Sequence, residues 1–289
     1  MKAMILAAGL GTRLRPLTND RPKALVEING RTLLEITIER LKNFGVCELI
    51  VNVHHFAEMV VAFLKSKSNF GLRIEVSRED DLLLDTGGGL KKASWFFLEN
   101  SSALDEPFLL HNVDVISSID FSRMLQFHNE HHALATLAVQ VRESSRQLLF
   151  NQDLQLCGRR INNQETLIPA QQNETVPSRQ HATNPQKSVI SSEARNPSSP
   201  SSCSDSPLAA RHSPLPLAFS GIHIVSTRLF PLLTEATPVF SIIDSYLRLA
   251  SQGHKILAFR ADSYYWRDLG RPEDLAQAAL DLQQDPTLH

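Results

Sequence analysis

Apolar runs and helix-patterned segments alternate along the first third of the chain. Residues 3–8 form an apolar run of the kind that a strand buried on both faces shows, and residues 48–53 and 73–77 are β-rich. Between them, residues 33–44 and 57–67 carry apolar side chains at helical spacing. Strands that alternate with helices in this way predict a parallel sheet with right-handed crossovers.

The later part of the chain continues this alternation. Helices are predicted at residues 90–98, 121–128 and 242–250, with a last helix opened by Pro272 in its first turn. Strands are predicted at residues 108–110, 134–141, 147–151, 217–225, 255–259 and 264–270. We therefore expect a single α/β domain over residues 1–289, with helices on both faces of a mixed, mostly parallel, Rossmann-like sheet.

Residues 162–214 break the pattern. This stretch has no aromatic residue and no glycine, and it is rich in Ser, Pro, Asn and Gln. Too little apolar surface is present to offset the entropy of ordering the chain, so we expect a disordered, low-complexity insertion in the domain. A docking linker is the alternative for this stretch.

Charge and cysteine content narrow the classes of function. Lys and Arg (29) nearly balance Asp and Glu (31), so we expect no general field for nucleic acid or membrane surfaces. Cys47, Cys157 and Cys203 are odd in number and far apart, which argues against a disulfide framework and a zinc cluster. The sequence shows no leader pattern and no apolar run of ~18 residues, so a soluble protein of the reducing cytoplasm is expected.

Candidate chemistry begins where the first predicted strand ends. Gly9 and Gly11 break the apolar run into a turn, and glycines at a strand end let backbone N–H groups approach a phosphate closely. Four cations follow in this loop, namely Arg13, Arg15, Arg21 and Lys23. Together these features favour binding of a polyphosphate. A cation in a rim loop has no core to support, so we expect the loss of Lys23 to lower turnover far more than folding stability.

Three other interpretations of the glycine loop remain open. A dinucleotide-binding fingerprint needs a third glycine, where the chain has Leu14, and an acid after the second strand, where it has Asn52. A kinase-type P-loop needs Gly-Lys-Ser/Thr directly after the glycines, where the chain has Gly11-Thr12-Arg13. A plain glycine turn with solvated arginines is the third.

Other predicted strand ends carry polar residues that should meet this loop, because open parallel sheets bind ligands beyond the carboxyl ends of their strands. Asn52 lies at the end of the second strand, and the adjacent His54 and His55 are either a polar loop or ligands. Asp114 follows the fourth strand and is well placed for Mg²⁺, a cation that shares oxygen ligands with phosphates. A loop-capping role is the alternative for Asp114.

A further loop at this edge holds three consecutive glycines. Residues 85–92 are Asp-Thr-Gly-Gly-Gly-Leu-Lys-Lys, and the glycines stand immediately before the predicted helix at residues 90–98. The N–H groups and the dipole of a helix N-terminus can face a phosphate or a base edge. A flexible hinge before the helix is the alternative.

These segments together resemble the sugar-1-phosphate nucleotidyltransferases. The resemblance is carried by Gly9-Leu-Gly-Thr-Arg-Leu-Arg-Pro-Leu-Thr18, by Arg21-Pro-Lys-Ala-Leu25, and by residues 85–89, 111–114, 217–225 and 266–270. The chain departs from the family pattern at Ala24, where a second proline is usual, and at Val113, where a small residue is usual. The resemblance implies the three-layer α/β/α fold of nucleotide-diphospho-sugar transferases. It also implies that the insertion at residues 162–214 lies in a hairpin.

The resemblance also implies roles for individual residues. It implies that Arg13 and Lys23 are catalytic and stabilise charge moving onto pyrophosphate. Nucleotide contacts are implied for Ala8, Gly9, Gly11, Thr12, Arg13, Lys23, Asn52, Thr86, Gly87 and Gly88. Sugar contacts are implied for Asn112, Ser220 and Gly221, and Mg²⁺ ligation for Asp114 and Asp268.

The reaction that the resemblance implies is Mg²⁺-dependent transfer of a nucleotidyl group from a nucleoside triphosphate to a sugar 1-phosphate. The pattern is most similar to enzymes that use UTP with N-acetylmuramate 1-phosphate, and GTP with mannose 1-phosphate is the alternative. A nucleotide-sugar-sensing subunit without turnover is an alternative of another class. It predicts a missing lysine or a broken metal pair, whereas Lys23, Asp114 and Asp268 are all present. We expect a monomer or small homo-oligomer that binds neither nucleic acid nor membrane.

Overall fold

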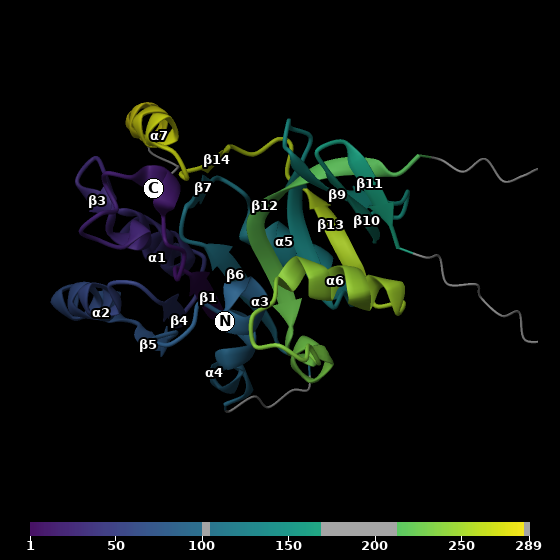
Figure 1. Cartoon of the computed structure of the whole chain (residues 1–289), viewed down its shortest axis with the longest axis horizontal. Coiled ribbons are helices and arrows are strands. Elements are labelled where there is room, and N and C mark those ends of the chain that lie inside the picture. Colours follow the sequence, from purple (N-terminus) through teal and green to yellow (C-terminus); the bar gives the residue numbers. More distant parts are fainter. Residues whose placement is uncertain (100–104, 169–212, 286–289) are drawn as a thin grey trace, which may run out of the picture.

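The computed structural model describes residues 1–99, 105–168 and 213–285, and one mixed sheet runs through them (Figure 1). Its strands are β1 (Lys2–Leu6), β4 (Glu48–Val53), β5 (Arg73–Arg78), β6 (Pro107–Asn112), β8 (Ala135–Gln140), β9 (Arg146–Phe150), β10 (Leu156–Ile161), β11 (Gln164–Leu167), β12 (Leu215–Ser226) and β13 (Ile256–Arg260). They lie in the order β11-β10-β9-β12-β6-β1-β4-β5, and β8 pairs with both β12 and β13. Two small ladders join β2 (Glu27–Ile28) to β3 (Arg31–Thr32) and β7 (Val115–Ser117) to β14 (Trp266–Asp268).

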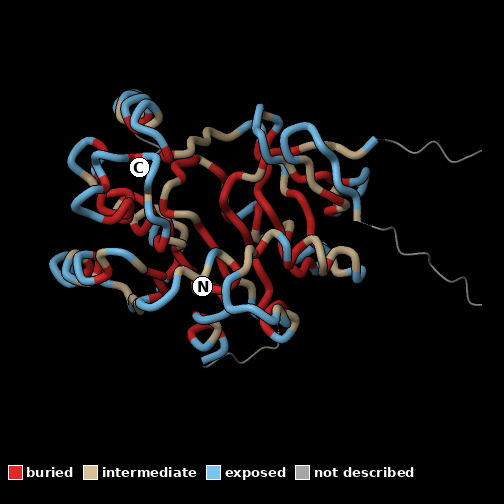
Figure 2. The backbone as a smooth tube through the Cα atoms, in the orientation of Figure 1, coloured by how far each residue is buried: buried red, intermediate tan, exposed pale blue. Residues whose placement is uncertain are grey.

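Helices cover both faces of the sheet, which confirms the three-layer α/β/α arrangement. One core contains side chains of α1 (Leu33–Asn43), α2 (Ala57–Ser66), α5 (Phe121–Glu130) and α7 (Pro272–Gln284). The other contains side chains of α3 (Asp85–Lys92), α4 (Ser94–Leu98) and α6 (Ile242–Ser251). Strand β1 contributes Ala3 and Ile5 to the first core and Met4 to the second, because successive side chains of a strand point to opposite faces. Figure 2 shows the central strands as the buried part of the chain.

The directions of the strands decide which loops share an edge. Strands β4, β1 and β6 are mutually parallel, as the alternation of strands and helices predicts. Strand β12 runs antiparallel to β6, and β8 runs antiparallel to β12. Strand β8 therefore points the same way as β6, and the carboxyl ends of β1, β4, β6 and β8 lie at one edge. Loops that follow these strands can meet there.

The glycine run of residues 87–89 lies inside a helix, which corrects the expectation that it precedes one. Helix α3 begins at Asp85, and the predicted helix at residues 90–98 is divided between α3 and α4. Glycine is a poor helix former, so the local pattern favours a loop. Close packing overrides that preference, because a Cβ on Gly88 would lie 2.1 Å from the Pro238 carbonyl oxygen.

The expected disordered insertion at residues 162–214 is wrong at its start. Strand β11 pairs antiparallel with β10 from Gln164 to Leu167, and such backbone hydrogen bonds do not depend on apolar side chains. The hairpin expected around this insertion is also wrong, since β12 pairs with β9 and not with β11. The rest of the predicted insertion, residues 169–212, lies outside the described residues.

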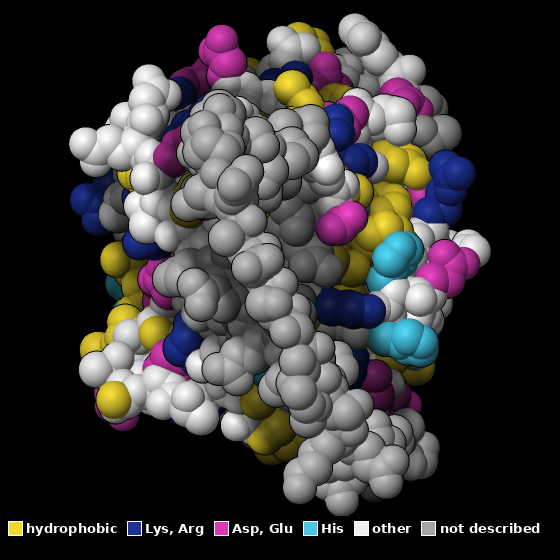
Figure 3. All heavy atoms as spheres, turned by 90° about the vertical axis from the view of Figure 1, so that its right-hand side faces the viewer, with side chains coloured by type: hydrophobic (Ala, Val, Ile, Leu, Met, Phe, Trp, Pro, Cys, Tyr) yellow, Lys and Arg dark blue, Asp and Glu magenta, His cyan; other side chains and the backbone are white. Residues whose placement is uncertain are grey.

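The described surface carries charges of both signs. On the face shown in Figure 3, described Lys and Arg side chains are interspersed with Asp and Glu side chains. Within the described residues, no helix has the length and apolar character that a membrane crossing requires. Cys47 and Cys157 are free thiols, and Cys203 lies outside the described residues.

Candidate active site

A cavity of about 570 Å³ opens at the edge where β1, β4 and β6 end. Most of the site residues implied by the sequence line it, namely Ala8, Gly9, Gly11, Thr12, Arg13, Lys23, Asn52, Thr86, Asn112 and Asp114. They come from segments far apart in the sequence, because parallel strands bring the loops at their carboxyl ends together. Arg15 and Arg21 are exposed and do not line the cavity, and Arg21 instead pairs with Asp20.

The glycine loop needs glycine at position 11 for two reasons. Gly11 has a φ of +62°, a conformation that other residues adopt only under strain. In addition, a Cβ at this position would lie 3.0 Å from Thr18 Cγ2 and 3.1 Å from Lys23 Cβ. The Thr18 hydroxyl donates a 2.9 Å hydrogen bond to the Gly11 carbonyl oxygen and holds the loop closed. The missing side chain of Gly11 therefore lets Lys23 approach the loop.

Lys23 is more deeply placed than a rim-loop cation. It opens a short 3-10 helix, Lys23–Leu25, is only 7% exposed, and its ammonium group forms an ion pair with the Asp114 carboxylate. Lys23 is thus not an exposed rim cation, and the expected effect of its loss on turnover and stability stays a prediction. A sequence pattern cannot show this ion pair, because the partner is supplied by the loop after β6, far away along the chain.

Asp268 meets Asp114 through the pairing of β14 with β7. Asp268 lies opposite Val115 in this ladder, and the Leu269 N–H donates a 2.8 Å hydrogen bond to the Asp114 carbonyl oxygen. Burial, followed by the negative charge of Asp114, raises the pKa of the Asp268 carboxyl. The structure thus brings together two carboxylates that the sequence places 154 residues apart (268 − 114).

Gly270 leaves room for a cation beside this carboxylate pair. A Cβ on Gly270 would lie 2.6 Å from Arg13 Nη2 and 2.6 Å from Asp268 Oδ1, so the guanidinium and the carboxylate approach the same glycine. The Gly270 N–H donates a 2.6 Å hydrogen bond to Asp268. Arg13, Lys23 and Asp114 therefore line one end of the cavity, and Asp268 lies next to them without lining it.

The two carboxylates are a donor set that fits Mg²⁺. The ion prefers oxygen ligands and is commonly held by one or two carboxylates together with substrate phosphates. Two facing carboxylates disfavour each other's ionised form, and a cation between them relieves that repulsion. Within the described ranges, no group of three or more His, Cys, Asp or Glu side chains is arranged to hold a metal, so a complete protein cage of such ligands is not present there.

Asn52 and Glu79 form a buried hydrogen-bonded pair at the cavity wall. The Ala7 N–H donates to Asn52 Oδ1 at 2.7 Å, and Asn52 Nδ2 donates to Glu79 Oε1 at 2.7 Å. The Leu84 N–H donates to the other oxygen of Glu79 at 2.9 Å. These bonds tie the ends of β1 and β4 to the loop after β5. Glu79, which is 1% exposed and lines the cavity, was missed by the sequence analysis although it follows a predicted strand end.

Gly87 and Gly88 do not line the cavity, although nucleotide contacts were expected for them. Their N–H groups both donate to the Phe240 carbonyl oxygen, at 2.9 and 3.2 Å, instead of facing an open site. A Cβ on Gly87 would lie 2.4 Å from the Phe240 ring. These glycines serve the contact with the segment before α6. Thr86, at the edge of the run, does line the cavity, and its hydroxyl accepts a 3.0 Å hydrogen bond from the Ile242 N–H.

The residues expected to contact sugar pack beside β7 and β14. Gly221 packs against Asn112, since a Cβ there would lie 2.9 Å from Asn112 Nδ2, and its φ of +74° again favours glycine. The Ser220 hydroxyl is buried without a hydrogen-bond partner, while its carbonyl oxygen accepts a 2.7 Å hydrogen bond from Trp266 Nε1. Ser220 and Gly221 lie where the register of β12 against β8 shifts. Of this group, Asn112 alone lines the cavity.

The two adjacent histidines take part in the loop structure. His54 Nδ1 and the Glu79 carbonyl oxygen are 2.5 Å apart, and the His55 ring packs against Phe56. Neither histidine lines the cavity. The interpretation of these residues as a polar loop accounts for both contacts.

Comparison with known proteins gives a family that agrees with this arrangement of glycine loop, cations and paired carboxylates. Residues 2–148 match the model of the nucleotidyl transferase family. The chain belongs to the nucleotidyl transferase family. The family resemblance inferred from the sequence is thereby confirmed. The match includes the glycine loop, Lys23 and Asp114, and it ends before Asp268.

Two relatives of this nucleotidyl transferase illustrate the similarity. N-acetylmuramate alpha-1-phosphate uridylyltransferase of Caulobacter vibrioides is 47% identical over 116 residues, covering 39% of this chain and 46% of the relative. A probable mannose-1-phosphate guanylyltransferase of Oryza sativa subsp. japonica is 39% identical over 140 residues, covering 48% of this chain and 38% of the relative. The matched region thus spans less than half the length of each relative.

Solved structures resemble the nucleotidyl transferase chain over nearly its whole length. HddC from Yersinia pseudotuberculosis, complexed with GMP-PN, has a TM-score of 0.65 at 19% identity, covering 97% of this chain and 99% of that one. The inositol-1-phosphate CTP transferase from T. maritima has a TM-score of 0.64 at 16% identity, covering 98% and 94%. At such low identity these likenesses show the fold alone.

Proposed function

We propose that this chain transfers a nucleotidyl group from a nucleoside triphosphate to a sugar 1-phosphate and releases pyrophosphate. The observation that carries the proposal is the meeting of Lys23, Asp114 and Asp268 beside the glycine loop, from three separate segments. Family membership over residues 2–148 supports the same chemistry. A plain glycine turn with solvated arginines gives no reason for a buried lysine and two facing carboxylates.

The glycine loop and its two cations have separate roles in the proposed reaction. The amides at Gly9 and Gly11 approach the phosphates of the triphosphate, as glycine-rich turns do elsewhere. An oxygen of the sugar 1-phosphate is already anionic, so it attacks the α-phosphorus in line without a general base. Arg13 and Lys23 then neutralise charge that moves onto the leaving pyrophosphate.

Asp114 and Asp268 would hold Mg²⁺ in this mechanism. When bound, the ion would neutralise phosphate charge together with Arg13 and Lys23. Lys23 already contacts Asp114, so the ammonium group both balances that carboxylate and lies next to the phosphates. Asp268 is held in place by the Gly270 N–H, which fixes the direction of the carboxylate.

The substrate pair that we favour is UTP with N-acetylmuramate 1-phosphate or a similar hexose 1-phosphate. The uridylyltransferase of Caulobacter vibrioides, 47% identical over the matched region, supports this choice. GTP with mannose 1-phosphate is the second candidate, supported by the guanylyltransferase relative at 39% identity.

A panel of substrates tests the proposal. The four ribonucleoside triphosphates are combined with N-acetylmuramate 1-phosphate, N-acetylglucosamine 1-phosphate, glucose 1-phosphate and mannose 1-phosphate, and pyrophosphate release is followed with Mg²⁺. We expect release only when an acceptor is present, fastest with UTP and N-acetylmuramate 1-phosphate. Lys23→Met should lower the rate about 100-fold or more, whereas Lys65→Met, an exposed lysine of α2, should not. Nucleotide binding without pyrophosphate release from any pair would instead identify a sensing subunit.

A further inference from the structure

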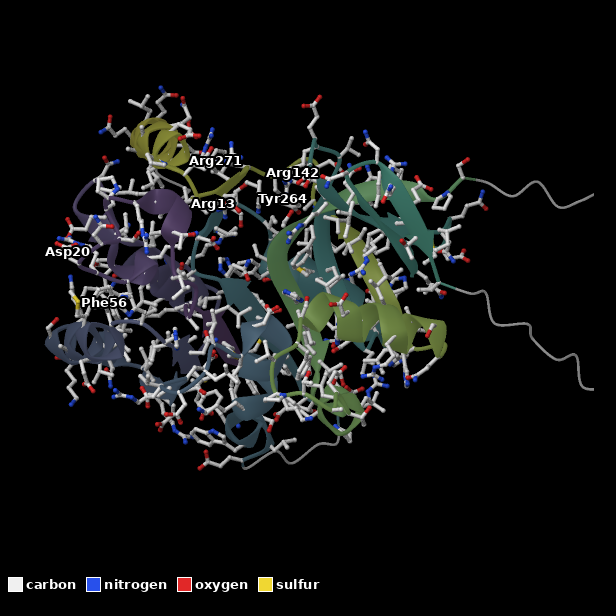
Figure 4. The ribbon with its side chains drawn as sticks, viewed as in Figure 1. Arg13, Asp20, Phe56, Arg142, Tyr264 and Arg271 are labelled. Carbon is white, nitrogen blue, oxygen red and sulfur yellow. The ribbon has the colours of Figure 1, made fainter. Side chains whose placement is uncertain are left out.

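Arg142 stands at the active-site edge without having been implied by any motif. It follows β8 by two residues, and the carboxyl end of β8 lies at the same edge as that of β6, where the cavity opens. Figure 4 shows Arg142 and Arg13 at the same side of the molecule, near β14. The loop after β8 therefore brings a cation to the edge where the cavity opens, although Arg142 itself does not line the cavity.

The Arg142 guanidinium is held in a fixed position by two contacts. It lies 3.7 Å from the centroid of the Trp266 ring, and one terminal nitrogen donates a 2.6 Å hydrogen bond to the Phe219 carbonyl oxygen. Stacking on an aromatic face and a planar fork of donors are properties of arginine that lysine lacks. The contacts fix the plane of the guanidinium and leave other donors for a ligand.

No carboxylate forms an ion pair with Arg142 among the residues that the structure describes, and its buried Nε lacks a hydrogen-bond partner. Other arginines of the second half are paired, for instance Arg159 with Asp244 at 2.6 Å and Arg267 with Asp281 at 2.9 Å. A half-buried guanidinium with an unpartnered donor is costly unless an anion satisfies it. Asp268 acts on this cation electrostatically without an ion pair between them, so the guanidinium is suited to bind an anion from outside the folded chain.

The neighbours of Arg142 place it on the acceptor side of the site. Trp266 and Asp268 are two residues apart on β14, so their side chains share one face of that strand. Arg142 interacts electrostatically with Asp268, and Trp266 donates to the Ser220 carbonyl oxygen. The guanidinium thus lies beside Asp268 and Trp266, and Arg142 and Trp266 donate to the neighbouring carbonyl oxygens of Phe219 and Ser220.

We propose that Arg142 binds an anionic oxygen group of the sugar 1-phosphate acceptor, a step that rests on the proposed function. The group is either the 1-phosphate itself or a carboxylate on the sugar, both of which match the donor fork of arginine. Arg142 then selects the acceptor and holds it beside the carboxylate pair. It has no contact with the nucleoside triphosphate in this arrangement.

Kinetics of Arg142→Gln test the assignment. We expect KM for the acceptor to rise about 10- to 100-fold, as loss of a charged hydrogen bond predicts, while KM for the nucleoside triphosphate changes less than twofold. Arg159→Gln removes the same charge from a paired position on β10 and should change neither constant. Arg142→Lys keeps the charge without the planar stack, and we expect an intermediate KM for the acceptor.

Two acceptors distinguish the sources of the anion. If Arg142 binds the 1-phosphate, Arg142→Gln raises KM equally for N-acetylmuramate 1-phosphate and N-acetylglucosamine 1-phosphate. If it binds a sugar carboxylate, KM rises for the first alone, because only that sugar carries a carboxylate. Either result supports the assignment.

Other outcomes overturn it. An unchanged KM for both acceptors, or an equal rise in KM for the triphosphate, would overturn the role of Arg142 and leave the proposed function intact. If Arg142→Gln fails to fold, an unchanged acceptor KM in Arg142→Lys would likewise overturn the role of Arg142. A wild-type chain that releases no pyrophosphate with any acceptor would instead overturn the proposed function.

Discussion

Replacing Gly11 by alanine tests whether the shape of the phosphate loop depends on this residue. Alanine at a φ of +62° costs about 1–2 kcal/mol, because its Cβ approaches the backbone too closely. The same Cβ would lie 3.0 Å from Thr18 Cγ2 and 3.1 Å from Lys23 Cβ, so both side chains must move by a few tenths of an ångström. We therefore expect Gly11→Ala to lower the free energy of unfolding by about 1–3 kcal/mol. Displacement of Lys23 should also lower the rate of pyrophosphate release.

Gly9→Ala is the matched control in the same loop. A Cβ on Gly9 meets nothing within 4 Å, and this glycine does not have a positive φ. Its free energy of unfolding should be unchanged or raised by up to about 1 kcal/mol, since alanine restricts the unfolded chain. Gly9 lines the cavity, however, so the added methyl group occupies space that a phosphate would use. We expect a raised KM for the nucleoside triphosphate at normal stability.

Urea unfolding and initial rates of pyrophosphate release, measured on both variants, separate the two effects. Gly11→Ala should lose stability and turnover together, whereas Gly9→Ala should lose triphosphate affinity alone. Wild-type stability and rate in Gly11→Ala would refute the geometric reasoning. An unchanged triphosphate KM in Gly9→Ala would show that no phosphate approaches this part of the loop.

Three further predictions concern the metal pair, the glycine run and the buried His128. Asp114→Asn and Asp268→Asn should each remove most activity, and the double variant should cost little more; strictly multiplicative losses with unchanged Mg²⁺ dependence would assign the two carboxylates separate tasks. Gly88→Ala places a Cβ 2.1 Å from the Pro238 carbonyl oxygen and should lower the free energy of unfolding by about 1–3 kcal/mol in urea titrations. An unchanged free energy of unfolding would mean that the segment before α6 moves without cost. Burial lowers the pKa of His128 to about 4. As pH falls below 6.5, His128 is therefore protonated in the unfolded chain before it is protonated in the folded chain, and stability is lost between pH 6.5 and about 4. By pH 5 the decrease in the free energy of unfolding should be about 2 kcal/mol larger in the wild type than in His128→Gln. Equal decreases in urea titrations would contradict a buried, neutral His128.

The parallel half of the fold follows closely from the sequence pattern. The alternation of strands and helices up to β6 depends on local spacing, and β1, α1, β4, α2 and β5 lie within a few residues of their predicted positions. The second half was harder to predict. Strand β11 is held by backbone pairing with β10 and has no local apolar signal. Helix α3, which lies before β6, is an exception in the first half, because Gly87 and Gly88 are placed by packing against Phe240 and Pro238.

The residues of the site also divide into those that the sequence indicates and those that only the fold reveals. Gly11, Lys23 and Asp114 stand out because they follow strand ends or motifs, and the structure brings them together. Arg142 has no such signal, since its importance depends on a stack with Trp266 that only the folded chain creates. Ion pairing of Lys23 with Asp114 likewise joins two distant loops, which one-dimensional spacing does not reveal. The cytoplasmic location and the assembly state stay predictions.

Phosphorus NMR of the complete reaction tests the central claim most directly. The purified chain is incubated with UTP, N-acetylmuramate 1-phosphate and Mg²⁺, and the signals of all phosphorus atoms are followed with time. The account predicts that UTP and the sugar 1-phosphate disappear in equal amounts while pyrophosphate and a sugar-linked diphosphate appear one for one. If the panel identifies another substrate pair, the same stoichiometry must hold for it. Pyrophosphate or phosphate formed without loss of any sugar 1-phosphate would contradict the account.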